Sequence, residues 1–260
     1  MRIHPSLLPR WAPGSLLDEL PEAAMDLLLG LGRPVTYPAG ASLIREGASD
    51  TTAMLILHGC VKVIGTCEDG GTVLLALRAP GELVGELSAL DSKPRSATVV
   101  AIRPAETRLL TAEVLRDYLR RTPEATEALH RSMAAKLRGA TRYRIDAGSG
   151  SATARLARVL DNLLHTHAEP SPEGVQITVP LSHTDLAALA NVSDASVQRA
   201  LRTLRSSGAV ATRYRGVLVR EPALLRAIAN QTGPAPAVRP GQIRPKVARE
   251  GGAIHDFGPA

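Results

Sequence analysis

The spacing of apolar residues changes its period near Thr111, and this change constrains the fold more than any other feature of the sequence. Before Thr111, apolar residues come in short runs bounded by Gly, Pro or Asp. Short runs at regular spacing are typical of strands in a small β-barrel or jelly roll. After Thr111, apolar residues recur at the 3.6-residue period of helices. The sequence therefore predicts an α+β chain, with strands in the first half and mainly helices in the second.

The predicted strands of the first half are Val35–Tyr37, Ser42–Ile44, Ala53–His58, Cys60–Ile64, Thr72–Leu77, Ser96–Ala101 and Thr107–Leu110. Asp69–Gly71 separates two of them and is a hairpin signal. A short helix is predicted over Pro21–Leu29, because Gly30 and Gly32 follow its apolar residues. Residues 1–14 lack periodicity and are predicted to form a loose arm.

A long amphipathic helix is predicted over Glu124–Ala147, a stretch without proline. Its apolar stripe consists of Leu129, Met133, Leu137, Ala140, Thr141 and Ile145. The stripe is longer than a small barrel can cover, so we expect it to form the seam of a homodimer. The alternative is that it packs against its own barrel. Gly148–Ser151 follows as a predicted flexible hinge.

Two short helices are predicted beyond a helix over Ala152–His165, a loop over Pro170–Gly174 and a strand over Val175–Val179. The first begins after Ser182, an N-cap candidate with Asp185 three residues on, which is a capping-box pattern. This helix, His183–Leu189, ends at the tight turn Ala190–Val192, and the second helix begins at Ser193.

The second short helix has an apolar face and a basic face. The apolar face consists of Val197, Ala200, Leu201 and Leu204. The opposite face consists of Asp194, Ser196, Gln198, Arg199, Arg202 and Arg205. Two helices joined by a three-residue turn, with a basic exposed side on the second, form a helix-turn-helix pattern.

A basic hairpin is predicted after this helix, framed by Gly208–Val210 and Gly216–Val219, with Arg213 and Arg215 at its tip. Residues 193–220 contain six Arg and one acidic residue, whereas residues 1–122 contain 13 basic and 14 acidic residues. The net charge of +6 therefore arises in the second half. A DNA phosphate backbone selects such a surface, so double-stranded DNA is the predicted partner.

The segment Gly85–Thr98, which reads GELSALDSKPRSAT, interrupts the strand pattern of the first half. It holds Glu86 and Arg95 nine residues apart among small residues. An arginine fork pairs with phosphate, a glutamate accepts hydrogen bonds from sugar hydroxyls, and exposed backbone N–H groups complete an anion site. The segment therefore indicates a sugar-phosphate pocket. The alternative is a surface loop with two unremarkable charges.

Gly85–Leu87 followed by Pro94–Thr98 resembles the phosphate-binding cassette of cyclic-nucleotide-binding domains, as found in the cyclic AMP receptor protein family. The resemblance implies that Glu86 binds the ribose 2′-hydroxyl, that Arg95 holds the cyclic phosphate and that Ser96 adds a hydroxyl contact. The implied effector is cyclic AMP in the first place and cyclic GMP in the second. The ligand-binding residues it implies are Gly85, Glu86, Leu87, Arg95, Ser96, Ala97 and, from the long helix, Thr141.

The second half resembles the winged helix-turn-helix of the cyclic AMP receptor and fumarate–nitrate reduction regulator family, and the resemblance to the family extends from Leu16 to Leu224. It implies a homodimeric transcription regulator with RNA polymerase as a further partner. The DNA-contacting residues it implies are His183, Thr184, Ser193, Asp194, Ala195, Ser196, Gln198, Arg199, Arg202, Arg213 and Arg215.

Two departures from the family pattern bear on specificity. Asp194 and Ala195 stand where the best-known members place an Arg and a Glu that read bases, although Arg199 keeps the third base-reading position. The family's usual half-site is therefore not expected. Ala140 and Thr141 align with two hydroxyl residues that contact the adenine, and only Thr141 keeps a hydroxyl, so selectivity for the base stays open.

The resemblance implies three regions: residues 1–122 as a cyclic-nucleotide-binding β-roll (jelly roll), 123–150 as dimerisation helix and hinge, and 151–230 as winged helix-turn-helix DNA-binding domain. Residues 231–260 are rich in Pro, Gly and Ala, and this composition predicts a disordered tail. We expect no enzyme and no metal, because no nucleophile motif or metal-ligand spacing is found. Cys60 and Cys67 are expected to be reduced structural thiols. Without a signal peptide or a long apolar run, the protein is expected to be cytoplasmic, away from membranes.

Two alternatives to a cyclic-nucleotide-controlled regulator stay open. The first keeps the DNA-binding half but makes it independent of ligand, or has it sense another nucleotide or a redox signal through Cys60 and Cys67. The second is a nucleotide-sensing module whose C-terminal half binds protein. The dependence of binding on salt separates DNA binding from protein binding.

Overall fold

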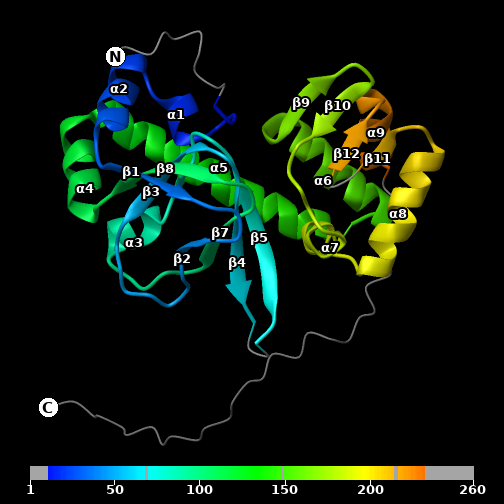
Figure 1. Cartoon of the computed structure of the whole chain (residues 1–260), viewed down its shortest axis with the longest axis horizontal. Coiled ribbons are helices and arrows are strands. Elements are labelled where there is room, and N and C mark those ends of the chain that lie inside the picture. Colours follow the sequence, from blue (N-terminus) through cyan, green and yellow to red (C-terminus); the bar gives the residue numbers. More distant parts are fainter. Residues whose placement is uncertain (1–10, 68–69, 148, 214–215, 232–260) are drawn as a thin grey trace, which may run out of the picture.

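The first half of the chain is a β-roll built from two four-stranded antiparallel sheets (Figure 1). The structure is a computed structural model that describes residues 11–67, 70–147, 149–213 and 216–231. One sheet has the order β1-β8-β3-β6, formed by Arg33–Tyr37, Ala105–Leu110, Ala53–His58 and Leu83–Val84. The other has the order β2-β7-β4-β5, formed by Ser42–Ile44, Thr98–Ala101, Val61–Thr66 and Thr72–Arg78. The predicted β-roll is confirmed.

Apolar side chains from both sheets fill the roll. Leu43, Ile44, Met54, Ile56, Val61, Val84 and Val99 form one buried cluster. Along β7, buried residues alternate with half-buried ones, because successive side chains of a strand point to opposite faces. The antiparallel pairing of β4 with β5, from Val61 opposite Arg78 to Thr66 opposite Thr72, confirms the predicted hairpin. Asp69 of its turn lies outside the described residues.

Short helices close one side of the roll. They are α1 (Leu16–Glu19), α2 (Glu22–Gly30), α3 (Glu86–Asp91) and α4 (Ala112–Arg121). Leu16, Leu28, Leu55, Leu110 and Leu115 meet in one buried cluster between these helices and β3 and β8. The α2 helix was predicted. The α1 helix was not, because it is a single turn and its apolar residues carry no periodic signal. The α4 helix was not predicted as a separate element either.

The long helix α5 (Pro123–Ala147) leads from the roll to the second half of the chain (Figure 1). Ala125, Ala128 and Leu129 are buried in the cluster shared with α1 and α4. Farther along the helix, Leu137 is 69% exposed and Ile145 is 60% exposed. The predicted stripe is therefore divided: its first part packs against its own domain, and its second part faces solvent in the single chain.

The second half is a winged helix-turn-helix. Its elements are α6 (Ala152–Thr166), β9 (Ala168–Ser171), β10 (Gly174–Ile177), α7 (His183–Ala190), α8 (Asp194–Ser206), β11 (Val210–Arg213), β12 (Gly216–Val219) and α9 (Pro222–Ala229). The four strands form one antiparallel sheet in the order β11-β12-β10-β9. Leu156, Leu160, Val197, Leu204 and Leu225 form the centre of the core.

Two predicted boundaries are wrong for physical reasons. The segment Pro170–Gly174 was expected to be a loop, but Pro170 and Ser171 belong to β9, since an edge strand tolerates a proline. A strand was expected from Ser96, but β7 begins only at Thr98. Ser96 and Ala97 therefore stay in the loop that forms the candidate ligand pocket.

The β4–β5 hairpin of the roll contacts α7 of the second half. Lys62 Nζ on β4 lies 3.4 Å from Asp185 Oδ1 on α7. On β5, Leu77 packs against the apolar core of the winged helix-turn-helix. The two halves thus touch directly as well as through α5. Within the described residues, no helix is long and apolar enough to span a membrane.

Candidate functional site

The candidate ligand pocket lies where β6 ends and α3 begins, and it encloses about 130 Å³. All six residues that the sequence predicted from the Gly85–Thr98 segment line it: Gly85, Glu86, Leu87, Arg95, Ser96 and Ala97. Val63 of β4, Arg78 of β5 and Lys136 of α5 also line it. The folded chain therefore joins the two ends of the predicted segment to three other elements.

Gly85 shapes the pocket because its backbone takes a conformation that other residues rarely adopt. Its φ is +77°, in the left-handed region, and it is the N-cap of α3. A Cβ at this position would lie 2.6 Å from Arg95 Nη1 and 2.8 Å from the Thr52 carbonyl oxygen. Only glycine lets the guanidinium of Arg95 approach the backbone at this point.

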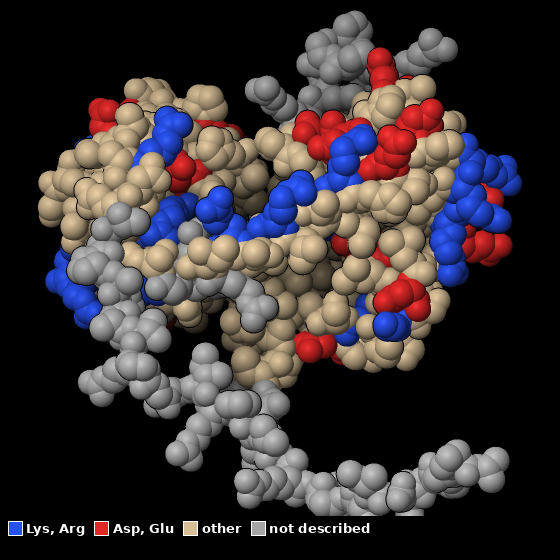
Figure 2. All heavy atoms as spheres, turned by 180° about the vertical axis from the view of Figure 1, so that it is seen from behind, with Lys and Arg blue, Asp and Glu red and all other residues tan. Residues whose placement is uncertain are grey.

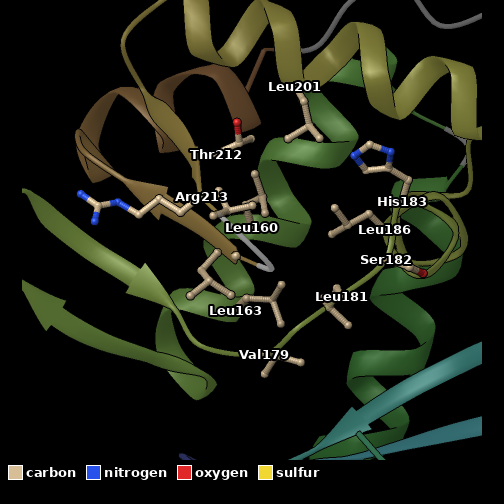
Figure 3. Close-up of a pocket in the computed structure, with 13 residues that line it drawn as sticks. Leu160, Leu163, Val179, Leu181, Ser182, His183, Leu186, Leu201, Thr212 and Arg213 are labelled. Atoms are coloured by element: carbon tan, nitrogen blue, oxygen red, sulfur yellow. The ribbon is translucent and has the colours of Figure 1, made fainter.

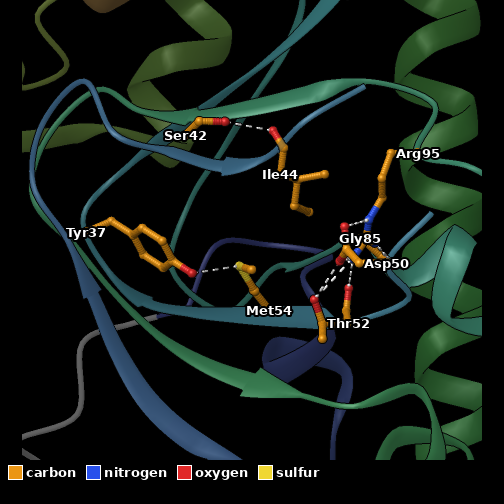
Figure 4. A network of polar contacts seen from close by, with 8 residues as sticks. All are labelled: Tyr37, Ser42, Ile44, Asp50, Thr52, Met54, Gly85 and Arg95. Carbon is orange, nitrogen blue, oxygen red and sulfur yellow. Dashed lines mark hydrogen bonds and ion pairs between the residues drawn. The ribbon is translucent and has the colours of Figure 1, made fainter. Parts of the chain in front are cut away.

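Arg95 is held by the chain from several sides (Figure 4). Its Nη1 donates to the Gly85 carbonyl oxygen at 2.9 Å, and its Nη2 donates to the Thr52 carbonyl oxygen at 2.5 Å. Its Nη2 and Nε also donate to the two carboxylate oxygens of Asp50. Neither Asp50 nor Thr52 was predicted as part of the site, because both lie more than 40 residues away in sequence.

Glu86 is buried and forms an ion pair with α5. Lys136 Nζ lies 2.7 Å from Glu86 Oε1 and donates to the Leu83 carbonyl oxygen at 2.6 Å. Lys136 was missed in the sequence, although a signal was present. It follows Leu129 by seven residues and Met133 by three, so a cation interrupts the apolar stripe of the helix.

Thr141 is exposed on α5 and is not among the residues that line the pocket. It lies five residues beyond Lys136, which corresponds to about 7.5 Å along a helix. The single chain therefore does not bring Thr141 to the other predicted ligand residues. Its contact with a base stays a prediction.

The two helices of the helix-turn-helix are fixed by the capping interactions that the sequence predicted. The Ser182 hydroxyl accepts from the Asp185 backbone N–H, and the Asp185 carboxylate accepts from the Ser182 N–H, which completes the capping box. Asn191 ends α7 with a φ of +48°, a left-handed conformation that asparagine tolerates. Ser193 caps α8. These local contacts fix where each helix begins and where α7 ends.

The outer face of α8 holds most of the predicted DNA-contacting residues. Exposed on it are Ser193, Asp194, Ala195, Gln198, Arg199 and Arg202, and Ser196 is half-buried. The Thr184 hydroxyl of α7 donates to Asp194 Oδ2 at 3.0 Å, and Arg199 Nη2 donates to the Ser196 hydroxyl at 2.8 Å. His183 and Thr184 are exposed at the start of α7.

The wing carries Arg213 at the end of β11, where its Nη2 lies 2.7 Å from Glu173 Oε1. The pKa of Glu173 is lowered, mainly by the hydrogen bond from Arg213. Arg213 therefore shares its charge with a carboxylate of the β9–β10 turn. Arg215, also predicted to contact DNA, lies outside the described residues.

Figure 2 shows Lys and Arg in several groups on one face of the molecule, some of them beside Asp and Glu. The basic residues of the chain are thus not confined to α8 and the wing. On α4, for example, Arg120 and Arg121 both pair with Asp117. Local charge on α8, rather than net charge, marks the candidate DNA surface.

A second hollow, of about 310 Å³, lies in the winged helix-turn-helix between α6, α7, α8 and the wing (Figure 3). Leu160, Leu163 and Leu186 point into it, whereas the Arg213 side chain points away. The hollow continues the apolar core and offers few polar groups to fix a ligand, so its lining favours a packing role.

The two cysteines stand at opposite ends of β4. Cys60 precedes the strand and is buried, and burial raises the pKa of its thiol to about 12. Cys67 follows the strand and is exposed. Seven residues of extended chain separate them by about 23 Å, far beyond the reach of a disulfide within one chain. Among the described residues, no group of three His, Cys, Asp or Glu is placed to hold a metal ion.

A β-roll with a phosphate-binding segment, followed by a winged helix-turn-helix, is the architecture of transcription regulators that have an N-terminal cyclic-nucleotide-binding domain. Residues 34–122 match the sequence profile of the cyclic nucleotide-binding domain, and residues 154–228 match that of the Crp-like helix-turn-helix domain. The chain belongs to the CRP/FNR family of transcription regulators.

Characterised relatives agree with this assignment. The chain is 33% identical over 214 residues to the cyclic AMP receptor protein of Thermus thermophilus. The aligned residues cover 82% of this chain and 96% of the relative. It is 26% identical over 189 residues to the CRP-like cAMP-activated global transcriptional regulator of Mycobacterium tuberculosis, with 73% and 84% covered.

A solved structure of a CRP-family transcriptional regulator from Thermus thermophilus superposes with a TM-score of 0.65 at 25% identity. It covers 76% of this chain and 97% of its own. The predicted family and fold class are thus confirmed.

Proposed function

We propose that the protein is a homodimeric DNA-binding transcription regulator controlled by a cyclic nucleotide, with cyclic AMP as the first candidate and cyclic GMP as the second. The main support for this proposal is the pocket that Gly85, Glu86, Arg95 and Ser96 line together. A buried guanidinium and a buried carboxylate at one cavity suit a phosphate and a sugar hydroxyl.

The chain's own residues fit such a ligand. Arg95 would bind the cyclic phosphate, Glu86 would accept from the ribose 2′-hydroxyl, and Ser96 would donate a hydroxyl bond. The close approach of the backbone at Gly85 leaves no room for a Cβ. Thr141 of α5 would contact the base, together with the same helix of a second copy.

Glu86 would connect the pocket to the long helix. Its carboxylate already accepts from Lys136 of α5 at 2.7 Å. A ribose hydroxyl that also donates to the Glu86 carboxylate would change the ion pair between Glu86 and Lys136. It would therefore change the free energy of one position of α5 relative to another. A ligand shifts such a two-state equilibrium only through its different affinity for the two states.

The dimer seam would lie along the second part of α5, where Leu137 and Ile145 are exposed. Two copies would then present two α8 helices about 34 Å apart, the spacing of successive major grooves. Residues of α8, His183, Thr184 and the arginines of the wing would contact DNA. RNA polymerase as a partner and a cytoplasmic location belong to the same proposal, as does a role without catalysis.

Titration of cyclic AMP and cyclic GMP into the purified protein tests the ligand half. We expect at least one to bind below millimolar concentration and Arg95→Ala to abolish that binding. Arg103→Ala is the matched control, because Arg103 lies in the same domain but does not line the pocket. If neither nucleotide binds, or if Arg95→Ala binds as well as the wild type, the ligand half is wrong.

Selection of binding sites from random DNA, with and without cyclic AMP, tests the DNA half. We expect a two-fold symmetric site that is enriched only with the nucleotide. Binding should weaken as salt rises, with a slope of about −0.9 per neutralised phosphate. The DNA half is wrong if the C-terminal half binds a protein instead of DNA and if that binding changes little with salt.

A regulator that is active without ligand is the second candidate, and one observation favours it. The charged residues of the pocket already pair within the chain: Arg95 with Asp50, Glu86 with Lys136, and Arg78 with Glu82 at 3.5 Å. Full-strength binding to the selected site without nucleotide would support this candidate. A redox signal through a Cys60–Cys67 pair is disfavoured by their separation along β4.

A further inference from the structure

Arg95 has few N–H groups left for a ligand. A guanidinium carries five N–H donors. Nε and Nη2 lie on one side of the guanidinium, and we call this side the side edge. It pairs with Asp50, with Nε 3.4 Å from Asp50 Oδ2. Nη2 also bonds the Thr52 carbonyl and hydroxyl oxygens, and Nη1 bonds the Gly85 carbonyl. Among the contacts of the described residues, a single N–H on Nη1 has no acceptor.

Two of these partners are neutral and are sufficient to fix the guanidinium plane. The carbonyl oxygens of Thr52 and Gly85 bond two different nitrogens of Arg95, and both belong to ordered backbone at the edges of β3 and α3. Asp50 adds a charge but no further constraint on the plane. Its contribution to orienting Arg95 is therefore redundant.

Asp50 and Arg95 differ in their access to water. The Arg95 side chain is 1% exposed, whereas the Asp50 side chain is 53% exposed and lies in the segment between β2 and β3. A half-exposed carboxylate turns into solvent at small cost, because water replaces its hydrogen bonds. The guanidinium has no such freedom, so Asp50 is the partner that can leave.

A phosphate approaching this pocket meets no other free cation among the described lining residues, since Lys136 pairs with Glu86 and Arg78 with Glu82. The strong, bidentate mode of arginine–phosphate binding needs two adjacent N–H groups. On Arg95 the side edge of Nε and Nη2 provides them, and Asp50 covers that edge.

We propose that Asp50 is a specificity-determining residue that competes with the ligand phosphate for the side edge of Arg95 and so sets the affinity of the pocket for phosphate-bearing ligands. This inference rests on the proposed function of the pocket. The inference predicts that Asp50 lowers the affinity of the pocket for cyclic nucleotides. A residue that only positions Arg95 would raise that affinity.

The charge of Asp50 supports competition. The hydrogen bond from Arg95 lowers the pKa of Asp50 below its ordinary value, so the carboxylate is ionised at neutral pH. The Thr52 hydroxyl also donates to Asp50 Oδ1, at 3.0 Å. An ionised carboxylate on the guanidinium repels an incoming phosphate, and an amide of the same shape does not.

The test is the affinity of full-length Asp50→Asn for cyclic AMP, cyclic GMP and adenosine, measured by calorimetry. We expect the variant to bind the cyclic nucleotides about tenfold more tightly than the wild type, which corresponds to ~1.4 kcal/mol. Adenosine, which lacks the phosphate, should bind equally to both proteins. Asp91→Asn is the matched control, because Asp91 is an exposed carboxylate at the end of α3 without contact to Arg95.

Asp50→Ala is the second variant, and thermal unfolding of both variants checks that the domain stays folded. Weaker or unchanged binding of cyclic nucleotides by folded Asp50→Asn and Asp50→Ala, beside a wild type that binds them, overturns the role of Asp50 alone. An equal gain in affinity for adenosine also overturns it. If neither the wild type nor the variants bind a cyclic nucleotide, the role of Asp50 and the proposed ligand both fall.

Discussion

Gly85 is the residue on which the geometry of the pocket depends most directly. It combines a positive φ with contacts to Arg95 and Thr52 that leave no space for a side chain. Two separate effects would follow from any substitution: backbone strain and steric displacement of Arg95. The chain allows the two to be separated, because Gly40 has a similar φ of +84° but open space around it.

We predict that Gly85→Ala lowers the free energy of unfolding by about 2–4 kcal/mol, whereas Gly40→Ala lowers it by only about 1 kcal/mol. Denaturant unfolding of both variants measures the difference. The Gly85 variant should also lose nucleotide binding, because Arg95 Nη1 must move. Equal losses of stability in the two variants would show that contact with Arg95 contributes nothing.

His167 is a buried residue at the end of α6, and its burial makes the stability of the C-terminal half depend on pH. Desolvation lowers its pKa to about 4. The unfolded chain therefore binds a proton below about pH 6.5 that the folded chain does not bind. Stability is highest above pH 6.5 and falls as the pH drops through this window to 4, by on the order of 3 kcal/mol.

We predict that His167→Phe removes most of this dependence between pH 6.5 and 4, since the side chain no longer titrates. Thermal unfolding at a series of pH values provides the measurement. His130→Asn, a change at an exposed position of α5, should keep the wild-type dependence. A His167→Phe profile with the full wild-type slope would assign the effect to other groups.

At the scale of elements, the contact between α3 and α5 is an ion pair in a largely buried setting. The side chains of Lys136 and Glu86 are 17% and 10% exposed. Removing one partner leaves a buried charge without compensation, whereas removing both charges does not. This asymmetry distinguishes a buried pair from the exposed pairs on the surface of α4.

We predict that Lys136→Met lowers the free energy of unfolding by about 2–4 kcal/mol and that Lys136→Met with Glu86→Gln recovers most of the loss. Arg120→Met, which breaks an exposed pair with Asp117 on α4, should cost less than about 1 kcal/mol. A double-mutant cycle by denaturant unfolding measures these values. Additive effects would show that the two side chains are not coupled.

At the scale of the whole molecule, α5 has two roles along its length. Its first part is covered by α1 and α4, and its second part exposes Leu137 and Ile145. A helix with apolar residues exposed beyond the domain that anchors it gains stability from a second copy. The proposed dimer, and the spacing of its two α8 helices on DNA, would therefore depend on Leu137 and Ile145.

We predict that Leu137→Glu converts the dimer to a monomer and weakens binding to a two-fold symmetric DNA site at least about tenfold. Analytical ultracentrifugation gives the oligomeric state. Leu27→Glu is the control, because Leu27 of α2 is 60% exposed and lies away from α5's second part. A Leu137 variant that remains dimeric would place the seam elsewhere.

Features that depend on neighbours along the chain could be predicted from the amino-acid sequence. The strands from Ala53 to Leu77, the capping box at Ser182 and the cap at Ser193 follow from local periodicity and hydrogen bonding. The residues of the Gly85–Thr98 segment could be identified for a different reason, because Glu86, Arg95 and their small neighbours lie within one short stretch and match a known motif.

Which other groups reach that segment depends on how distant parts of the chain pack together. Asp50 and Thr52 meet Arg95 because β3 runs beside β6, and Lys136 meets Glu86 because α5 passes close to the first residue of α3. The division of α5 into a covered and an exposed part depends equally on α1 and α4. Electrostatic contacts between segments 40 to 50 residues apart leave no periodic trace in sequence, so the partners of the pocket's charges emerge only once the chain is folded.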